Sequence, residues 1–175
     1  LGDVYKRQGT NVTVLGSLAF QGCTALQSAN IPASVTRIMD STFLNCSQLQ
    51  SVTIPDNVNY IGHSAFYNCS QLQTVTIPDA LTTILDQTYY NCDALQSLTL
   101  GNNVTTIYDR AFAFSNNLRS VYVSDSVMNI VDNAFEGNTA LTQVYMSQIA
   151  RNNLGLSFGS NLSLIHISEP TRPRL

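Results

Sequence analysis

The feature that most constrains this chain is a pattern that returns every 23 residues. The cysteines keep this spacing, and apolar columns keep it through most of the sequence. Self-similarity at a fixed period of roughly 20 to 50 residues is typical of a solenoid, in which each repeat forms one coil and packs only against its neighbours. The period therefore predicts one elongated array. The four cysteines are Cys23, Cys46, Cys69 and Cys92.

Each repeat contains a strand-like segment with the pattern L-x-x-V-x-I, as in Leu49, Val52 and Ile54. The spacing of two residues between the last two positions places their side chains on the same side of a strand, toward a core. A second apolar pair follows, as in Val58 and Ile61. An aromatic column comes next, and it comprises Phe20, Phe43, Phe66, Tyr89, Phe112 and Phe135. Because one such unit buries too little apolar surface to fold alone, neighbouring coils must complete the core.

The full pattern, C-x-x-L-x-x-V-x-I-P-x-x-V-x-x-I-x-x-x-A-F, resembles the BspA-like class of leucine-rich repeats from about Val12 to Met146. The resemblance implies a β-rich α/β solenoid of about six coils. This would be a right-handed leucine-rich-repeat superhelix with one strand of a parallel sheet and one short helical turn per repeat. It also implies a bacterial or protozoan protein, located at the cell surface or secreted, that adheres to host proteins or to other cells.

Aspartates stand just before the A-F segment in most copies, where an N-cap of the expected helical turn would lie. This column comprises Asp40, Asp86, Asp109 and Asp132. His63 occupies the same column, and we expect it at the surface beside Asp40 and Asp86. Other aspartates, as in Ile-Pro-Asp at 54–56, are expected in turns.

The two ends do not follow the repeat. Residues 1–8, LGDVYKRQ, can be encoded by CTC GGA GAT GTG TAT AAG AGA CAG, whose reverse complement translates to LSLIHISE, the residues at 162–169. Both ends resemble a transposase sequencing adapter read in opposite directions. We therefore expect adapter-derived residues at 1–8 and 162–175, and a solenoid fragment at 9–161 that is cut at both ends.

Composition excludes several classes of function. Charged residues make up only 11% of the chain, against about 25% in ordinary domains, and the net charge is −3. No basic stripe is present for nucleic acid, and no run of 18 apolar residues could insert into a membrane. We find no catalytic triad, phosphate loop or calcium loop, so the sequence predicts no enzyme, no cofactor and no metal.

The evenly spaced cysteines are expected to stack in a row, one per coil. Zinc sites pair their cysteines as C-x-x-C, which this chain lacks. Buried free thiols that act as small apolar groups are the favoured interpretation, with disulfides between coils or a metal site as alternatives.

The outward positions of the strand segment are the candidate binding site. They are polar in most copies, and the last of them changes from threonine to tyrosine toward the C-terminus. Tyrosine and arginine are enriched at binding hot spots. The candidate ligand-binding residues are Thr53, Thr76, Thr99, Arg119, Tyr122 and Tyr145. The sequence thus predicts a non-catalytic recognition or adhesion module for a protein or glycan partner. A spacer or stalk with no ligand is the alternative, and ice or crystal-surface binding through the S/T-x-T array is a third.

Overall fold

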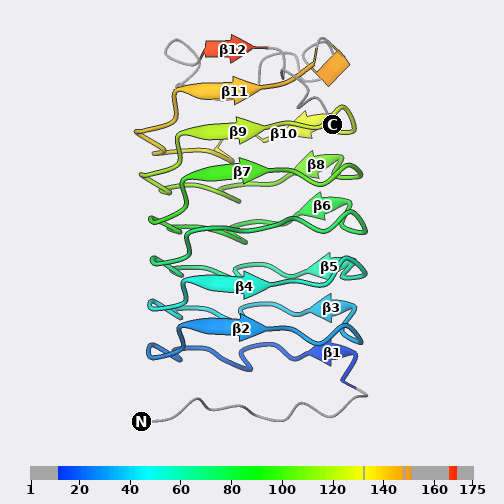
Figure 1. The fold of residues 1–175 in the computed structure, drawn as a ribbon, viewed down its shortest axis with the longest axis vertical. Coiled ribbons are helices and arrows are strands. Elements are labelled where there is room, and N and C mark those ends of the chain that lie inside the picture. The colour runs from blue at the N-terminus through cyan, green and yellow to red at the C-terminus, as the bar shows by residue number, and fades with distance from the viewer. Residues whose placement is uncertain (1–11, 132, 148, 151–165, 169–175) are drawn as a thin grey trace, which may run out of the picture.

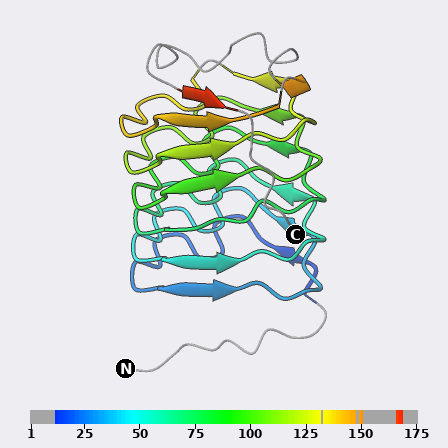
Figure 2. The ribbon, with the colours of Figure 1, turned by 45° about the horizontal axis from the view of Figure 1, so that its top comes forward.

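A computed structural model of the 175-residue chain describes residues 12–131, 133–147, 149–150 and 166–168. The chain winds into a β-solenoid of about six coils stacked along one axis (Figure 1). Each coil has three sides, which we name the strand face, the short-strand face and the turn face. Figure 2 shows the two sets of strands on different sides of the stack.

The strand face contains the three-residue strands. These are β2 (Ser28–Asn30), β4 (Ser51–Thr53), β7 (Ser97–Thr99), β9 (Ser120–Tyr122), β11 (Gln143–Tyr145) and β12 (His166–Ser168). The short-strand face contains the two-residue strands. These are β1 (Val14–Leu15), β3 (Arg37–Ile38), β5 (Tyr60–Ile61), β6 (Thr83–Ile84), β8 (Thr106–Ile107) and β10 (Asn129–Ile130). The turn face contains the remaining segment of each coil, such as residues 41–46.

All of the strand pairs are parallel, and every pair is offset by the same 23 residues. Ala29 lies opposite Val52, Ile38 opposite Ile61, and Val121 opposite Val144. Because the register equals the sequence period, each column of the repeat becomes a line of side chains along the solenoid. The predicted parallel-stranded solenoid is therefore confirmed.

Strand β12 lies in the segment that the sequence identifies as adapter-like. It pairs with β11 in the common register, with Gln143 opposite His166. An open sheet edge can accept an extended segment through backbone groups alone. This pairing therefore does not test the origin of the segment, and the boundaries at residues 8, 9, 161 and 162 remain predictions. Residues 1–8 lie outside the described part of the chain.

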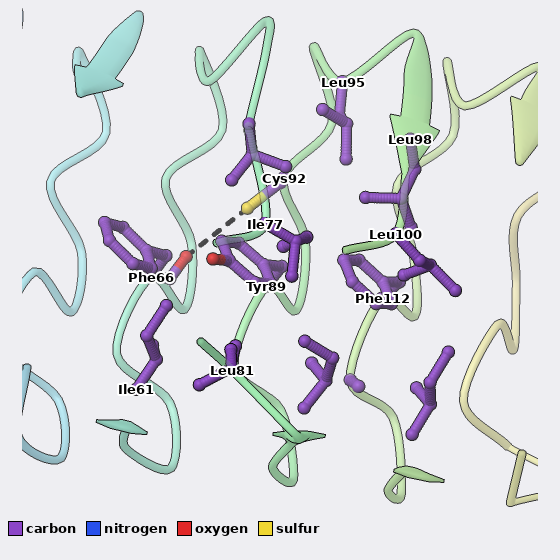
Figure 3. Close-up of a cluster of buried hydrophobic side chains, with 14 of the residues drawn as sticks. Ile61, Phe66, Ile77, Leu81, Tyr89, Cys92, Leu95, Leu98, Leu100 and Phe112 are labelled. Atoms are coloured by element: carbon purple, nitrogen blue, oxygen red, sulfur yellow. Dashed lines mark hydrogen bonds between the residues drawn. The ribbon is translucent and has the colours of Figure 1, made fainter. Parts of the chain in front are cut away.

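The core is one continuous column of buried side chains from all three sides (Figure 3). Rings of the aromatic column stack coil on coil, with centroids 5.1 Å apart for Phe20 and Phe43 and 5.2 Å apart for Phe66 and Tyr89. Leu72 and Leu95 of the leucine column are fully buried beside them. Burying one such side chain contributes about 1.5–3 kcal/mol, so the stacked columns are the main source of stability.

The predicted helical turn per repeat is wrong. Residues 41–46 and their equivalents form hydrogen-bonded turns, and no helix occurs within the described parts of residues 12–147. The cause is the backbone: Ser41 and Asn45 both have left-handed conformations, with φ of 56° and 62°. Only three residues remain between them, which is too short for a helical hydrogen-bond ladder.

The aspartate column consequently does not cap helices. Asp40 Oδ1 accepts a hydrogen bond from the backbone N–H of His63 at 3.0 Å, and Asp86 Oδ1 accepts one from Asp109 at 3.0 Å. Each carboxylate therefore bonds the same position in the next coil. Asp132 lies outside the described residues.

The cysteines are free, as expected, and three of them are buried; Cys23 is exposed, contrary to the prediction. Cys23 lies in the first described coil, so no described coil covers it. The thiol of Cys92 points to the backbone oxygen of Phe66 at 3.4 Å (Figure 3), and that of Cys69 points to Phe43 at 3.3 Å. Burial raises the pKa of the Cys46 thiol to about 11 and also raises the pKa values of the Cys69 and Cys92 thiols. These thiols are therefore protonated and unreactive at neutral pH.

Candidate functional site: the strand face

The strand face presents three outward columns: two lie just before the inward-facing residue at the middle of each strand, and one lies just after it. The first comprises Gln27, Gln50, Gln73, Gln96, Arg119 and Thr142, the second Ser28, Ser51, Thr74, Ser97, Ser120 and Gln143, and the third Asn30, Thr53, Thr76, Thr99, Tyr122 and Tyr145. Ser120 and Tyr145 are half-buried, and the other members are exposed. These columns thus form a regular polar surface, and the third column has two tyrosines next to β12.

Five of the six predicted site residues lie in the third column. Thr76 pairs with Thr99, Thr99 with Tyr122, and Tyr122 with Tyr145. Thr53 ends β4 one coil earlier. Arg119 is on the same coil as Tyr122 but lies in the first column, at the opposite edge of the face. The structure therefore aligns the threonines and tyrosines and separates them from the arginine.

The two tyrosines form a stacked pair. Their ring centroids lie 4.5 Å apart, and the ring planes differ by 11°. Parallel rings this close cannot lie side by side in one plane, so one face of each ring covers one face of the other. Tyr122 is 41% exposed, and the Tyr145 hydroxyl donates a hydrogen bond to Gln143 Oε1 at 2.9 Å. The pair is a preorganised aromatic group on β9 and β11, next to β12.

Arg119 differs from the other described arginines in its surroundings. Arg110 pairs with Glu136, with Nε and Oε2 2.9 Å apart. The guanidinium carbon of Arg37 lies 4.4 Å from the ring centroid of Tyr60. Arg119 is exposed and forms no ion pair with the carboxylates of the described residues.

His63 lies at the surface, as predicted. Its Nδ1 is 3.2 Å from Asp86 Oδ2, and the two side chains are 49% and 44% exposed. No three His, Cys, Asp or Glu side chains gather to hold a metal within the described part of the chain. Among the same residues, no helix is long and apolar enough to cross a membrane.

The sequence reasoning missed a second tyrosine pair, on the turn face. Tyr67 and Tyr90 stack with centroids 4.6 Å apart and planes 3° apart, and both are half-buried. Burial and the hydrogen bond with Tyr90 both raise the pKa of Tyr67, burial more strongly. The spacing of 23 between these residues was the signal that could have found them.

A family profile described as "BspA type Leucine rich repeat region" matches six copies over residues 10–169. A comparison with curated proteins found no match.

Several solved structures are similar. A T. pallidum leucine-rich repeat protein is 32% identical, with a TM-score of 0.73, over 76% of this chain and 62% of that one. A Bacteroides ovatus leucine-rich repeat protein is 30% identical, with a TM-score of 0.79, over 91% and 41%. A Faecalibacterium prausnitzii leucine-rich cell surface protein is 32% identical, with a TM-score of 0.69, over 73% and 34%. This chain therefore spans less than two thirds of the length of each of these proteins.

Proposed function

This chain belongs to the BspA-type leucine-rich repeat family, and we propose on that basis that it is a non-catalytic recognition module. Its partner is a protein or a glycan bound on the strand face, and the whole protein is exposed at the cell surface or secreted. The cell-surface description of the F. prausnitzii neighbour supports this location.

The stacked Tyr122–Tyr145 pair is the observation that carries the proposal. Large rigid aromatic side chains supply much of the binding energy at interfaces. Here the two rings already hold each other in place, so little side-chain entropy is lost when a partner docks. The regular polar columns beside them can supply hydrogen bonds.

The test compares the two tyrosine pairs. The variant Tyr122→Ala/Tyr145→Ala removes the strand-face pair, and Tyr67→Ala/Tyr90→Ala removes a stacked pair of the same chemistry from the turn face. Each protein is assayed against a panel of purified extracellular-matrix proteins and a printed array of defined glycans. We expect the first variant to lose the binding shown by the wild-type chain, and the second to retain it.

Equal binding by both variants would overturn the strand-face assignment. Absence of binding by the wild-type chain would favour the second candidate, a structural spacer. One observation supports a spacer: side chains link successive coils at regular intervals, as in Asn68 Nδ2 to Asn45 Oδ1 and Asn91 Nδ2 to Asn68 Oδ1, both at 2.9 Å. Such ladders stiffen a rod without any ligand.

A further inference from the structure

Charge is unevenly distributed over the solenoid. The described residues contain three arginines and eight carboxylates. None of the carboxylates belongs to the three outward columns of the strand face, which contain a single charged residue, Arg119. The carboxylates lie at turns and corners instead; they are Asp40, Asp56, Asp79, Asp86, Asp93, Asp109, Asp125 and Glu136. In the described columns of the strand face, the single charge is therefore positive, although the molecule as a whole is acidic.

Several of these carboxylates are already engaged by neighbouring coils. Asp79 Oδ1 accepts a hydrogen bond from the backbone N–H of Asn102 at 2.9 Å. Asp93 Oδ1 accepts one from the backbone N–H of Asn116 at 3.1 Å, and Asp125 accepts one from the Ser147 hydroxyl. These bonds hold the acidic groups at the coil edges, and no carboxylate of the described residues forms an ion pair with Arg119 that a partner's anion would have to displace.

The tyrosine pair favours the same kind of partner. The edge of an aromatic ring is electropositive and its face electronegative. Tyr122 and Tyr145 each cover one face of the other, and their second faces are directed along the solenoid toward the Thr99 and Ser168 coils, so the sides of the rings that point away from the core are edges. The Tyr122 hydroxyl adds a donor, and this residue is 41% exposed. Arginine N–H groups, ring edges and a phenol O–H all favour an electron-rich or anionic group.

We propose that the strand face binds an acidic polypeptide segment. One carboxylate of the segment pairs with Arg119, and residues next to it pack on the edges of Tyr122 and Tyr145. The proposal rests on the recognition function proposed above and specifies its partner. Arg119 and Tyr122 are three residues apart along an extended coil, about 10 Å, which roughly three residues of an extended peptide can span.

The same geometry disfavours a sugar as the ligand. A sugar ring packs against an open aromatic face. Here one face of each ring is covered by the other ring, and the second face is directed along the solenoid toward the next coil, at Thr99 for Tyr122 and at Ser168 for Tyr145. A polypeptide needs no such face, because it can meet ring edges with carboxylates and carbonyl oxygens and the polar columns with its backbone groups.

The experiment uses an array of 15-residue peptides, each synthesised in an Asp/Glu form and in a matched Asn/Gln form. We expect the wild-type chain to bind acidic members in preference to their amide forms, with affinity that falls as salt rises. Arg119→Gln should weaken binding to acidic members by about tenfold and reduce the salt dependence, whereas Arg119→Lys should retain part of the affinity. Arg37→Gln, on the short-strand face, is the matched control and should leave binding unchanged.

Three outcomes would overturn the proposal. Equal binding of acidic and amide peptides, or equal effects of Arg119→Gln and Arg37→Gln, would remove the role of charge. If the tyrosine variant still loses binding in that case, the recognition function survives without its acidic partner. Stronger Arg119-dependent binding to chondroitin sulfate than to any acidic peptide would identify an acidic glycan instead. Circular dichroism of every variant ensures that losses are read only from folded protein.

Discussion

At the centre of the array, successive coils are joined differently on the turn face than on the strand face and the short-strand face. On the short-strand face, β5 and β6 are not paired, so the described strands form two separate three-stranded sheets. On the strand face, the coil between β4 and β7 is attached through isolated bridges, Ser51 to Thr74 and Thr76 to Thr99. The turn face is continuous at the same level: Phe66 N–H donates to the Thr88 oxygen at 2.8 Å. At this level the turn-face hydrogen bonds are therefore continuous, whereas the short-strand sheet is interrupted and the strand-face sheet is reduced to isolated bridges.

His63 offers a physical reason for the interruption. At this corner the carboxylates of Asp40 and Asp86 each accept the backbone N–H of the next coil. His63 stands between them in the column, and its ring instead faces Asp86 Oδ2. One backbone-to-carboxylate hydrogen bond between coils is therefore replaced by an exposed contact between the His63 ring and the Asp86 carboxylate, beside the place where β5 and β6 are not paired.

The largest expected effect is on the aromatic stack that crosses this boundary. Phe66 is fully buried, and its ring stacks on Phe43 and Tyr89. Phe66→Ala should lower the free energy of unfolding by about 3–5 kcal/mol, measured by urea denaturation. Val52→Ala, at a half-buried position on the strand face, should lower it by about 1 kcal/mol. A loss below about 1 kcal/mol for Phe66→Ala would contradict the dominance of the turn-side core.

A smaller effect is expected at Gly62, where two coils approach closely. An added Cβ would lie 2.5 Å from the Asp40 backbone nitrogen and 2.7 Å from the Met39 carbonyl carbon. Gly62→Ala should therefore destabilise the fold by about 1–3 kcal/mol in thermal or urea unfolding. Gly16 occupies the same column and has nothing within 4 Å, so Gly16→Ala should change stability by less than about 0.5 kcal/mol. Equal effects at the two glycines would refute the close approach.

Asn45, Asn68 and Asn91 are linked by side-chain hydrogen bonds on the turn face. Substitutions at Asn68 test the left-handed backbone conformation of this turn. Asn68 has φ of 58°, and its side chain bonds both Asn45 and Asn91. Asn68→Ala should cost about 1–2 kcal/mol more than Asn68→Gly, because alanine is strained in this conformation and glycine is not. Both variants lose the same side-chain bonds, so their difference isolates the backbone contribution. An alanine variant as stable as the glycine variant would contradict the assigned turn.

The smallest effect is local and concerns the interruption itself. His63→Asp supplies a carboxylate that can accept the N–H of Asp86, as its neighbours in the column do. We expect slower hydrogen exchange at Asp86 and Leu85 and a gain of about 0.5–1 kcal/mol in stability. Asp40→Ala is the opposite control and should speed exchange at His63. Unchanged exchange at Asp86 in His63→Asp would show that the histidine does not cause the break.

One of the two left-handed positions of each turn could be predicted in most coils from the sequence. One left-handed position per coil is filled by glycine or asparagine in five coils, at Gly22, Asn45, Asn68, Asn91 and Gly137, and by Phe114 in the sixth. Glycine and asparagine are the residues that tolerate this conformation. The other position is filled by Leu18, Ser41, Ser64, Gln87 and Arg110. These residue types carry no such preference, so the second bend, and with it the absence of a helical turn, could not be predicted.

The candidate site was likewise predicted only in part from the sequence. Period and residue type placed Thr53, Thr76, Thr99, Tyr122 and Tyr145 in one line. The stacking of the tyrosines depends on side-chain rotamers in adjacent coils, which no column of the sequence specifies. The turn-face pair, Tyr67 and Tyr90, follows the same period. It lies outside the strand segment, where the outward side chains were expected, so it was not predicted.

The sequence by itself determined the repeat, the 23-residue register and most of the core, because one period governs every column and most apolar columns are buried. Only the tertiary structure decided how successive coils are joined. The orientation of Asp40 toward the next coil, the close approach at Gly62 and the unpaired strands beside His63 depend on backbone angles and on contacts between residues 23 positions apart. Such contacts exist only once the coils are stacked.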